Sequence, residues 1–170
     1  MKLDLMPLAQ QPGAVMPFTL QLDLSDVEWY GTRPATQPVH VEGQVQNRAG
    51  ALELKARLDT VLSLTCDRCA KPFRREKTVE YETLLAFELA NGESDDIVLL
   101  NGDGELELDE LMREVVLLEM DTKNLCSEDC KGLCPGCGAD LNVELCRCKK
   151  EIDPRLAVLA QLLEQKDTDQ

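Results

Sequence analysis

The sequence is poor in aromatic residues and histidine, and it has no long apolar run. Aromatic residues make up 4% of its 170 residues, and His40 is its one histidine. No stretch reaches the roughly 20 apolar residues that a transmembrane helix needs. Asp4, Pro7 and Pro12 interrupt the start of the chain, which argues against a secretory signal. We therefore expect a soluble, cytoplasmic protein with no membrane partner.

Sequence motifs of common enzymes are missing as well. The sequence has no Gly-rich phosphate loop after a strand, no G-x-S-x-G and no H-E-x-x-H. No spacing of carboxylates nominates a catalytic pair, and His40 falls in a predicted strand far from the cysteines in sequence. We expect a protein that is not an enzyme.

Basic residues are outnumbered, 18 to 32, and the net charge is −14. Phosphate repels such a chain, which therefore does not resemble a general nucleic-acid binder. The charge is nevertheless uneven, because two basic runs, 66–77 and 146–150, flank cysteine pairs. These runs supply the candidates for contact with RNA or a protein partner: Arg68, Lys71, Arg74, Arg75, Arg147, Lys149 and Lys150.

Alternating apolar positions predict strands over residues 17–30, around 39–46 and over 51–66, with a turn at 47–50. A further alternating stretch follows Cys66 and Cys69, so this pair is expected at the tip of a β-hairpin. The acidic residues 90–105 predict a loop with one short strand near 97–100. The predicted fold is α+β, an antiparallel β meander or partly open barrel with two helices and a C-terminal zinc-ribbon-like module.

The two helices are predicted at 106–120 and 153–166. The first has Leu108, Leu111, Val115 and Leu118 at helical spacing, with Asp109 as its N-cap, and the second begins with Asp153 as N-cap and Pro154 at its first position. The chain thus divides into an antiparallel β domain with an amphipathic helix (1–120), a cysteine-rich metal-binding module (121–150) and a C-terminal helix with a frayed tail (151–170).

Eight cysteines are the most informative feature of the sequence. Clustered cysteines in a reducing compartment indicate metal ligands more often than disulfides, and a zinc site takes four tetrahedral ligands. We predict two closed structural zinc sites per chain, although iron in an all-thiolate cage is not distinguished by sequence. The predicted ligands are Cys66, Cys69, Cys126, Cys130, Cys134, Cys137, Cys146 and Cys148.

The spacing leaves two divisions of these cysteines open. The economical one makes a local site from 134, 137, 146 and 148, and a second from 66, 69, 126 and 130. Its rival joins Cys66 and Cys69 to Cys134 and Cys137. In either case the module 121–150 has too few apolar residues for a core of its own, so metal is expected to order it.

A redox function is the alternative interpretation. Arg68 and Lys71 lie close to Cys66 and Cys69 in sequence and could lower a thiol pKa. A thiol-based redox or metal-responsive regulator would use this pair. Redox pairs of this type, however, are expected at a helix N-terminus in a βαβ unit, whereas here two strands flank the pair.

Several stretches together resemble the YceD-like family, in its cysteine-rich bacterial branch: "CDRCAKPF", "LELDELMREVVLLEMDTKNLC", "CKGLCPGCGADLN", "CRC" and "DPRLAVLAQLL". The resemblance runs from about residue 15 to 165. Some members keep the first Cys-x-x-Cys and a later His/Cys pair at the positions of Cys126 and Cys130 but lack the later cysteines. The resemblance therefore favours Cys66, Cys69, Cys126 and Cys130 as one unit.

The resemblance implies a function in large-subunit ribosomal RNA accumulation and ribosome assembly, with no established catalytic activity. The expected partner is a ribosomal protein, an assembly factor or the RNA itself. A protein partner agrees better with the net charge of −14. The oligomeric state is not predicted.

Overall fold

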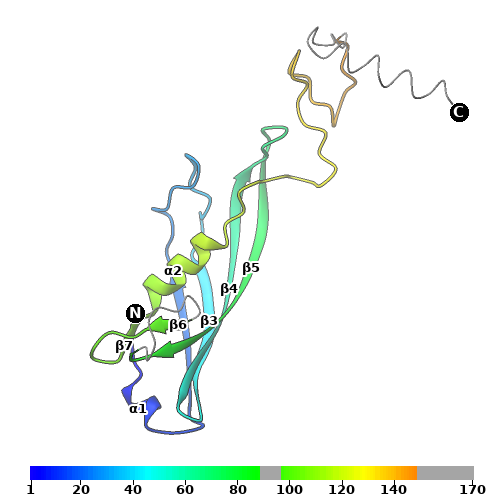
Figure 1. Ribbon diagram of the computed structural model, residues 1–170. Helices are drawn as coiled ribbons and strands as arrows, with labels where there is room; N and C mark the ends of the chain where they lie inside the picture. Colours follow the sequence, from blue (N-terminus) through cyan, green and yellow to red (C-terminus); the bar gives the residue numbers. More distant parts are fainter. Residues whose placement is uncertain (89–96, 149–170) are drawn as a thin grey trace, which may run out of the picture.

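The protein is an α+β structure made mostly of strands (Figure 1). The computed structural model describes residues 1–88 and 97–148. The elements of this part are β1 (Lys2–Asp4), α1 (Met6–Ala9), β2 (Val15–Leu22), β3 (Val39–Arg48), β4 (Ala51–Thr65), β5 (Pro72–Ala86), β6 (Ile97–Leu99), β7 (Glu105–Glu107) and α2 (Leu108–Leu118). The predicted helix at 153–166 lies outside the described residues.

The main sheet has five strands in the order β2-β3-β4-β5-β6. Its first four strands form the predicted antiparallel meander. β6 pairs parallel to β5, so the sheet is mixed, and it is not closed; of the two predicted alternatives, the meander describes the first four strands. β1 and β7, which the sequence analysis did not predict, pair with each other in a separate two-stranded sheet.

One face of the main sheet carries the core. Leu20, Val41, Leu58 and Val79 are paired across four neighbouring strands and share this face, because partner residues in antiparallel strands project to the same side. The residues between them project to the other face, on which the paired residues Thr19, Glu42, Arg57 and Glu80 are exposed. The core is therefore one-sided, as the alternation of the sequence predicts, and it consists mainly of leucine and valine.

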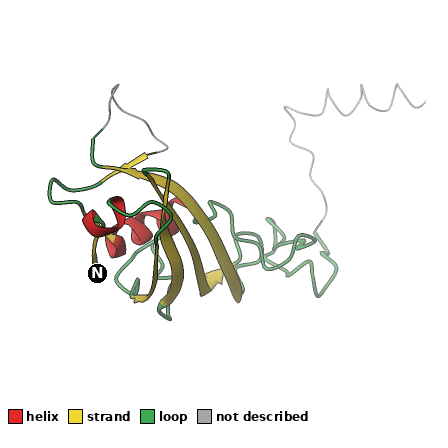
Figure 2. Cartoon of the chain, turned by 90° about the horizontal axis from the view of Figure 1, so that it is seen from below, coloured by secondary structure: helices red, strands yellow, loops and turns green. Residues whose placement is uncertain are grey.

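Helices α1 and α2 lie on the same side of the curved sheet (Figure 2). Leu108, Met112, Val115 and Val116 of α2 are buried in the core. The prediction that Leu118 faces the core is wrong, since its side chain is 85% exposed. The N-cap is Glu107, without a side-chain hydrogen bond, and not the predicted Asp109, which occupies the first turn.

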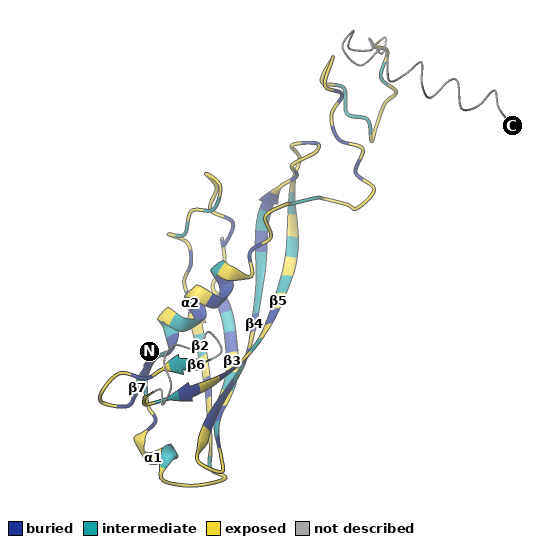
Figure 3. Ribbon diagram, viewed as in Figure 1, coloured by how far each residue is buried: buried dark blue, intermediate teal, exposed yellow. Residues whose placement is uncertain are grey.

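The hairpin of β4 and β5 extends beyond the rest of the sheet (Figure 3). β3 pairs with β4 only as far as Asp59, whereas β4 and β5 remain paired to Thr65 and Pro72. Residues 60–65 and 72–77 thus form an arm of two paired strands, which an isolated bridge between Ala35 and Leu62 joins on the β4 side, with residues 66–71 at its tip. The arm lifts Cys66 and Cys69 away from the main core. Within the described residues, no helix is long and apolar enough to cross a membrane.

Candidate metal centre

The chain after α2 runs along the arm and returns to its tip. Lys77 and Arg75 of β5 contact this segment: Lys77 donates to the carbonyl of Glu119, and Arg75 pairs with Asp121 at 3.1 Å. Arg75 also donates to the carbonyl oxygen of Leu125 at 2.7 Å. These contacts place the next residue, Cys126, beside the cysteines of the tip.

Two turns of the same design hold the two Cys-x-x-Cys pairs. In the first, the amide of Cys66 donates to the Lys71 carbonyl at 2.9 Å, and the amide of Ala70 donates back to the Cys66 carbonyl at 2.8 Å. In the second, the equivalent bonds from Cys134 to Ala139 and from Gly138 to Cys134 are both 2.8 Å. The fifth residue of each turn has a positive φ, 56° at Ala70 and 74° at Gly138. Each turn folds back on itself, so that both of its sulfur atoms reach one point.

The first set consists of Cys66, Cys69, Cys126 and Cys130, whose sulfur atoms all lie within 4.8 Å of one another. Four sulfur atoms placed tetrahedrally at about 2.3 Å from a zinc ion would lie about 3.8 Å apart. The Sγ atoms of Cys66 and Cys130 are 3.8 Å apart, and those of Cys69 and Cys126 are 3.7 Å apart. The spacing therefore fits a metal-binding tetrathiolate, and it is well beyond the roughly 2.05 Å of a disulfide.

The second set consists of Cys134, Cys137, Cys146 and Cys148, with sulfur atoms likewise within 4.8 Å of one another. Sγ of Cys146 lies 3.1 Å from that of Cys134 and 3.8 Å from that of Cys137. A Cβ atom at Gly136 would come 3.2 Å from the sulfur of Cys148, so a glycine leaves room for this set to close. The structure thus groups the cysteines as in the first of the two divisions, with 134, 137, 146 and 148 in one set and 66, 69, 126 and 130 in the other. It does not place Cys66 and Cys69 in one set with Cys134 and Cys137.

The thiols of each set have divergent pKa values. The backbone N–H of Cys126, followed by those of Cys69 and Arg68, lowers the pKa of Cys66 to about 6. The neighbouring thiols of Cys66 and Cys69 raise the pKa of Cys126 to about 12. In the second set, the Cys146 thiol and the amides of the turn lower the pKa of Cys134 to about 6, whereas that of Cys148 is raised to about 12 by Cys137 and Cys146. Four thiolates cannot coexist so close together unless a cation offsets their repulsion.

Side chains join the two sets to each other. Lys71, at the tip of the arm, pairs at 2.5 Å with Asp140 of residues 134–148, which carry the second set and are called the second module here, and this contact lowers the pKa of Asp140 to about 2. Nδ2 of Asn142 lies 3.5 Å from Sγ of Cys130, a member of the first set. The amide of Leu133 donates to the Arg68 carbonyl at 2.9 Å. The second module is therefore attached to the first set by several contacts rather than by the chain alone.

Three of the five predicted contact residues that the structure describes are engaged within the protein. Arg68 donates to the carbonyls of Glu128 and Cys130, and Lys71 and Arg75 make the ion pairs described above. Arg74 and Arg147 are exposed, and within the described chain neither makes a side-chain hydrogen bond or ion pair. Lys149 and Lys150 lie outside the described residues. The basic side chains of the arm thus hold the cysteine module in place.

Sequence reasoning did not assign a role to Asp140 and Asn142. Both lie in "CPGCGADLN", where the turn residues attract attention and the polar residues resemble ordinary loop composition. Their partners, Lys71 and Cys130, belong to the arm and to the first set, so only the folded chain reveals the contacts. Ala70 was missed as well, although its position matches that of Gly138 in the second turn.

The comparison with known families decides to which group the chain belongs. A family described as "Large ribosomal RNA subunit accumulation protein YceD" matches residues 54–163, which include all eight cysteines. The chain belongs to the YceD family. No solved structure matches it.

Proteins similar to this chain come from bacteria and plants. A maize protein called "Large ribosomal RNA subunit accumulation protein YCED homolog 1, chloroplastic" is 29% identical over 150 residues, which cover 70% of this chain and 51% of the maize protein. An uncharacterized protein of Mycobacterium tuberculosis is 35% identical over 101 residues, 58% of this chain and 49% of its own. The chain thus spans about half the length of these relatives. The Bacillus subtilis protein YlbN is 26% identical over 170 residues, with 98% and 99% of the two chains covered.

Proposed function

We propose that this YceD-family chain is a non-enzymatic cytoplasmic factor that supports the accumulation of large-subunit ribosomal RNA and ribosome assembly. Family membership supplies the ribosomal RNA connection. The structural observation that carries the proposal is the pair of four-cysteine sets at the end of a long arm. In each set, four cysteines would occupy all four coordination positions of a metal ion, with no histidine among them. Such an arrangement suits a closed structural site rather than a catalytic one.

Each set would hold one zinc ion. Cys66 and Cys69 would ligate it from the arm and Cys126 and Cys130 from the chain after α2, whereas the second set would close the module on itself. A bound zinc ion supplies a cross-link and the positive charge that four thiolates need. The chain's own contribution is the two matched turns and the amides that favour the thiolate form of Cys66 and Cys134.

A basic protein is the partner that the charge distribution favours. The net charge is −14, and three cations of the arm, Lys71, Arg75 and Lys77, are paired with the carboxylates of Asp121 and Asp140. The acidic residues outnumber the basic ones 32 to 18, so the overall charge opposes the release of counterions from RNA. A ribosomal protein or an assembly factor with a basic surface would be attracted instead.

Depletion and rescue test this function. Cells that lack the chain should accumulate less large-subunit RNA relative to small-subunit RNA, and the wild-type chain should restore the ratio. A rescue variant with Cys69→Ser and Cys137→Ser, which removes one ligand from each set, should fail at equal protein abundance. An unchanged RNA ratio in depleted cells would contradict the proposal.

A regulator that uses Cys66 and Cys69 is the second candidate, and the lowered pKa of Cys66 is the observation in its favour. Both thiols are nevertheless buried, at 1% and 4% exposure, which limits access by an oxidant or a partner thiol. Thiol titration separates the two functions. Reversible oxidation of this pair at a defined potential, with loss of activity on oxidation, would favour the regulator; eight thiols that react only after chelation would favour the structural sites.

A further inference from the structure

An aromatic turn, residues 29–32, carries one ring that packs against the main core, Trp29, and one that does not, Tyr30. Trp29 and Thr32 exchange backbone hydrogen bonds of 2.7 and 3.0 Å around Tyr30 and Gly31. Both central residues have positive φ, 46° and 74°, the conformation of a type I′ turn, which favours asparagine or glycine at the first position. Tyr30 occupies that position with 76% of its surface exposed. The protein thus holds a large aromatic side chain in an unfavourable backbone conformation without gaining core packing from it.

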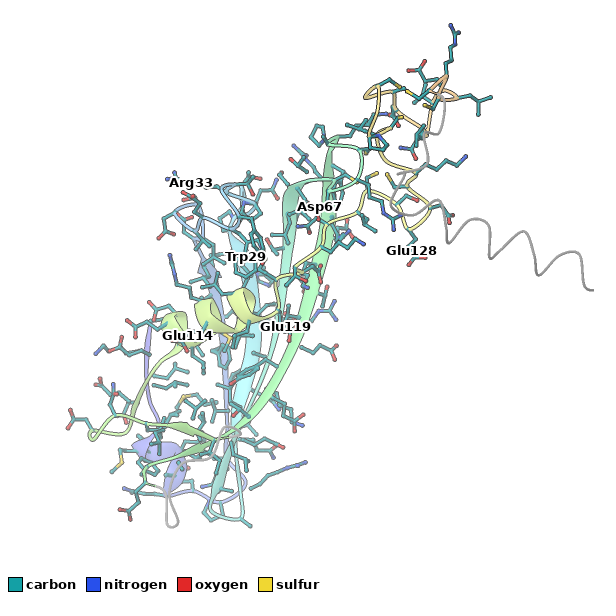
Figure 4. All side chains as sticks on the ribbon, turned by 45° about the horizontal axis from the view of Figure 1, so that its top comes forward. Trp29, Arg33, Asp67, Glu114, Glu119 and Glu128 are labelled. Atoms are coloured by element: carbon teal, nitrogen blue, oxygen red, sulfur yellow. The ribbon has the colours of Figure 1, made fainter. Side chains whose placement is uncertain are left out.

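The turn forms one wall of a pocket of about 350 Å³. The rings of Trp29 and Tyr30 stand edge to face, with centroids 5.3 Å apart. The opposite wall comes from the arm and from the segment after α2. The other lining residues are Thr32, Leu64, Thr65, Asp67, Thr122 and Asn124. Figure 4 shows Trp29 on the loop that also carries Arg33, beside the arm that carries Asp67.

The first cysteine set fixes the far wall of this pocket. Asp67 and Asn124 are joined by two hydrogen bonds, from the Asp67 amide to the Asn124 carbonyl at 2.8 Å and from the Asn124 amide to Oδ2 of Asp67 at 2.6 Å. Asp67 directly follows Cys66, and Asn124 precedes Cys126 by two residues. A metal ion in the first set would therefore hold the pocket in shape.

The chemistry of the lining selects a cation. Two aromatic rings, the carboxylate of Asp67 and several hydroxyl and amide oxygens line the pocket, and Asp67 is its one charged residue. A guanidinium group stacks on aromatic faces and donates in its plane to oxygen atoms, so it suits this combination better than a phosphate does. Arg33 and Lys123 lie on the flanking chain but do not line the pocket.

We propose that this pocket binds an arginine side chain of a basic protein partner. The inference rests on the proposed function, because it names the place where such a partner would dock. The exposed ring of Tyr30 would stack on the guanidinium group, with the Trp29 ring standing roughly perpendicular beside it, and Asp67 would accept its hydrogen bonds. The unfavourable conformation of Tyr30 is then explained by binding rather than by stability.

Titration of the metal-loaded full chain with a fluorescent decapeptide of alternating arginine and glycine tests the proposal. Tyr30→Asn should weaken peptide binding at least tenfold while raising the melting temperature by about 2–4 °C, because asparagine accepts the turn conformation. Asp67→Asn should also weaken binding at least tenfold, and it keeps an oxygen for the Asn124 amide. Glu80→Gln removes the same charge from the exposed face of β5 and should change peptide affinity less than twofold.

Equal peptide affinity in the wild type and Tyr30→Asn would overturn the proposal. An oligouridylate decamer provides a second test. If it binds the wild type more tightly than the peptide does, and binds Tyr30→Asn more weakly than the wild type, the pocket takes a nucleobase and the proposal is overturned. The proposed function and the pocket assignment can be contradicted independently of each other. If pocket variants fully restore large-subunit RNA in depleted cells, the pocket assignment is wrong and the function stands; if depletion leaves the RNA unchanged, the function is wrong whatever the pocket binds.

Discussion

Replacement of Cys137 by serine should unfold the second module and leave the sheet intact. Residues 134–148 have almost no apolar core: Cys134 is buried, but Val143 and Leu145 are 75% and 92% exposed. At roughly 1.5 kcal/mol per residue, ordering these 15 residues costs about 22 kcal/mol. Five backbone hydrogen bonds with donors between Cys134 and Glu144 offset about 5 kcal/mol of this cost. The remaining cost of about 17 kcal/mol is close to the ~10–16 kcal/mol that a structural zinc ion supplies.

Hydrogen exchange followed by mass spectrometry measures this effect. Cys137→Ser should lower the metal affinity of the second set by more than hundredfold, beyond the roughly 10–100-fold that loss of a supporting partner brings. The amides of Gly138, Leu141 and Glu144 should then exchange as in an unfolded chain, whereas those of β3 and β4 keep their protection. Val143→Ala, in the same loop, should leave both regions unchanged. Full protection of the module in Cys137→Ser, or equal loss in the sheet, would refute the reasoning.

Three further changes test the contacts around the two sets. Asn142→Ala removes the contact with Cys130 and should weaken metal binding at the first set about tenfold, measured by competition with a chromophoric chelator; an unchanged affinity would contradict the link. Ala70→Gly relieves a positive φ and should raise the unfolding free energy by about 1 kcal/mol in urea, whereas a decrease would show that the turn is not strained. Lys71→Met should raise the pKa of Asp140 from about 2 toward its ordinary value, as followed by carboxyl NMR. Because the folded pKa is lowered, this contact stabilises the protein above about pH 4, and its contribution is lost as the pH falls toward 2. The unfolding free energy of the variant should therefore fall less than that of the wild type between these two pH values.

The meander and the arm could be predicted because each depends on a local pattern. Apolar residues alternate through β2, β3, β4 and β5, and Cys-x-x-Cys interrupts the alternation where the hairpin turns. The short elements β1, β7 and α1 could not, since each has three or four residues. The parallel pairing of β6 depends on a long-range return of the chain, which no local signal encodes.

Much of the candidate site followed from the spacing of the cysteines. Four of them fit within 15 residues, so the spacing favoured a local second set, but it left open the rival that joins Cys66 and Cys69 to Cys134 and Cys137. The contacts that attach the module to the arm could not be foreseen. Basic residues such as Arg68 and Arg75 attract attention as candidates for RNA contact, but their partners are backbone carbonyls and carboxylates distant in sequence.

The most direct test of the central claim is elemental analysis combined with X-ray absorption on the protein purified without chelator. We predict two zinc ions per chain, each surrounded by four sulfur atoms at about 2.3 Å. Fully folded protein that contains no metal, or that holds its cysteines as disulfides, would contradict the account.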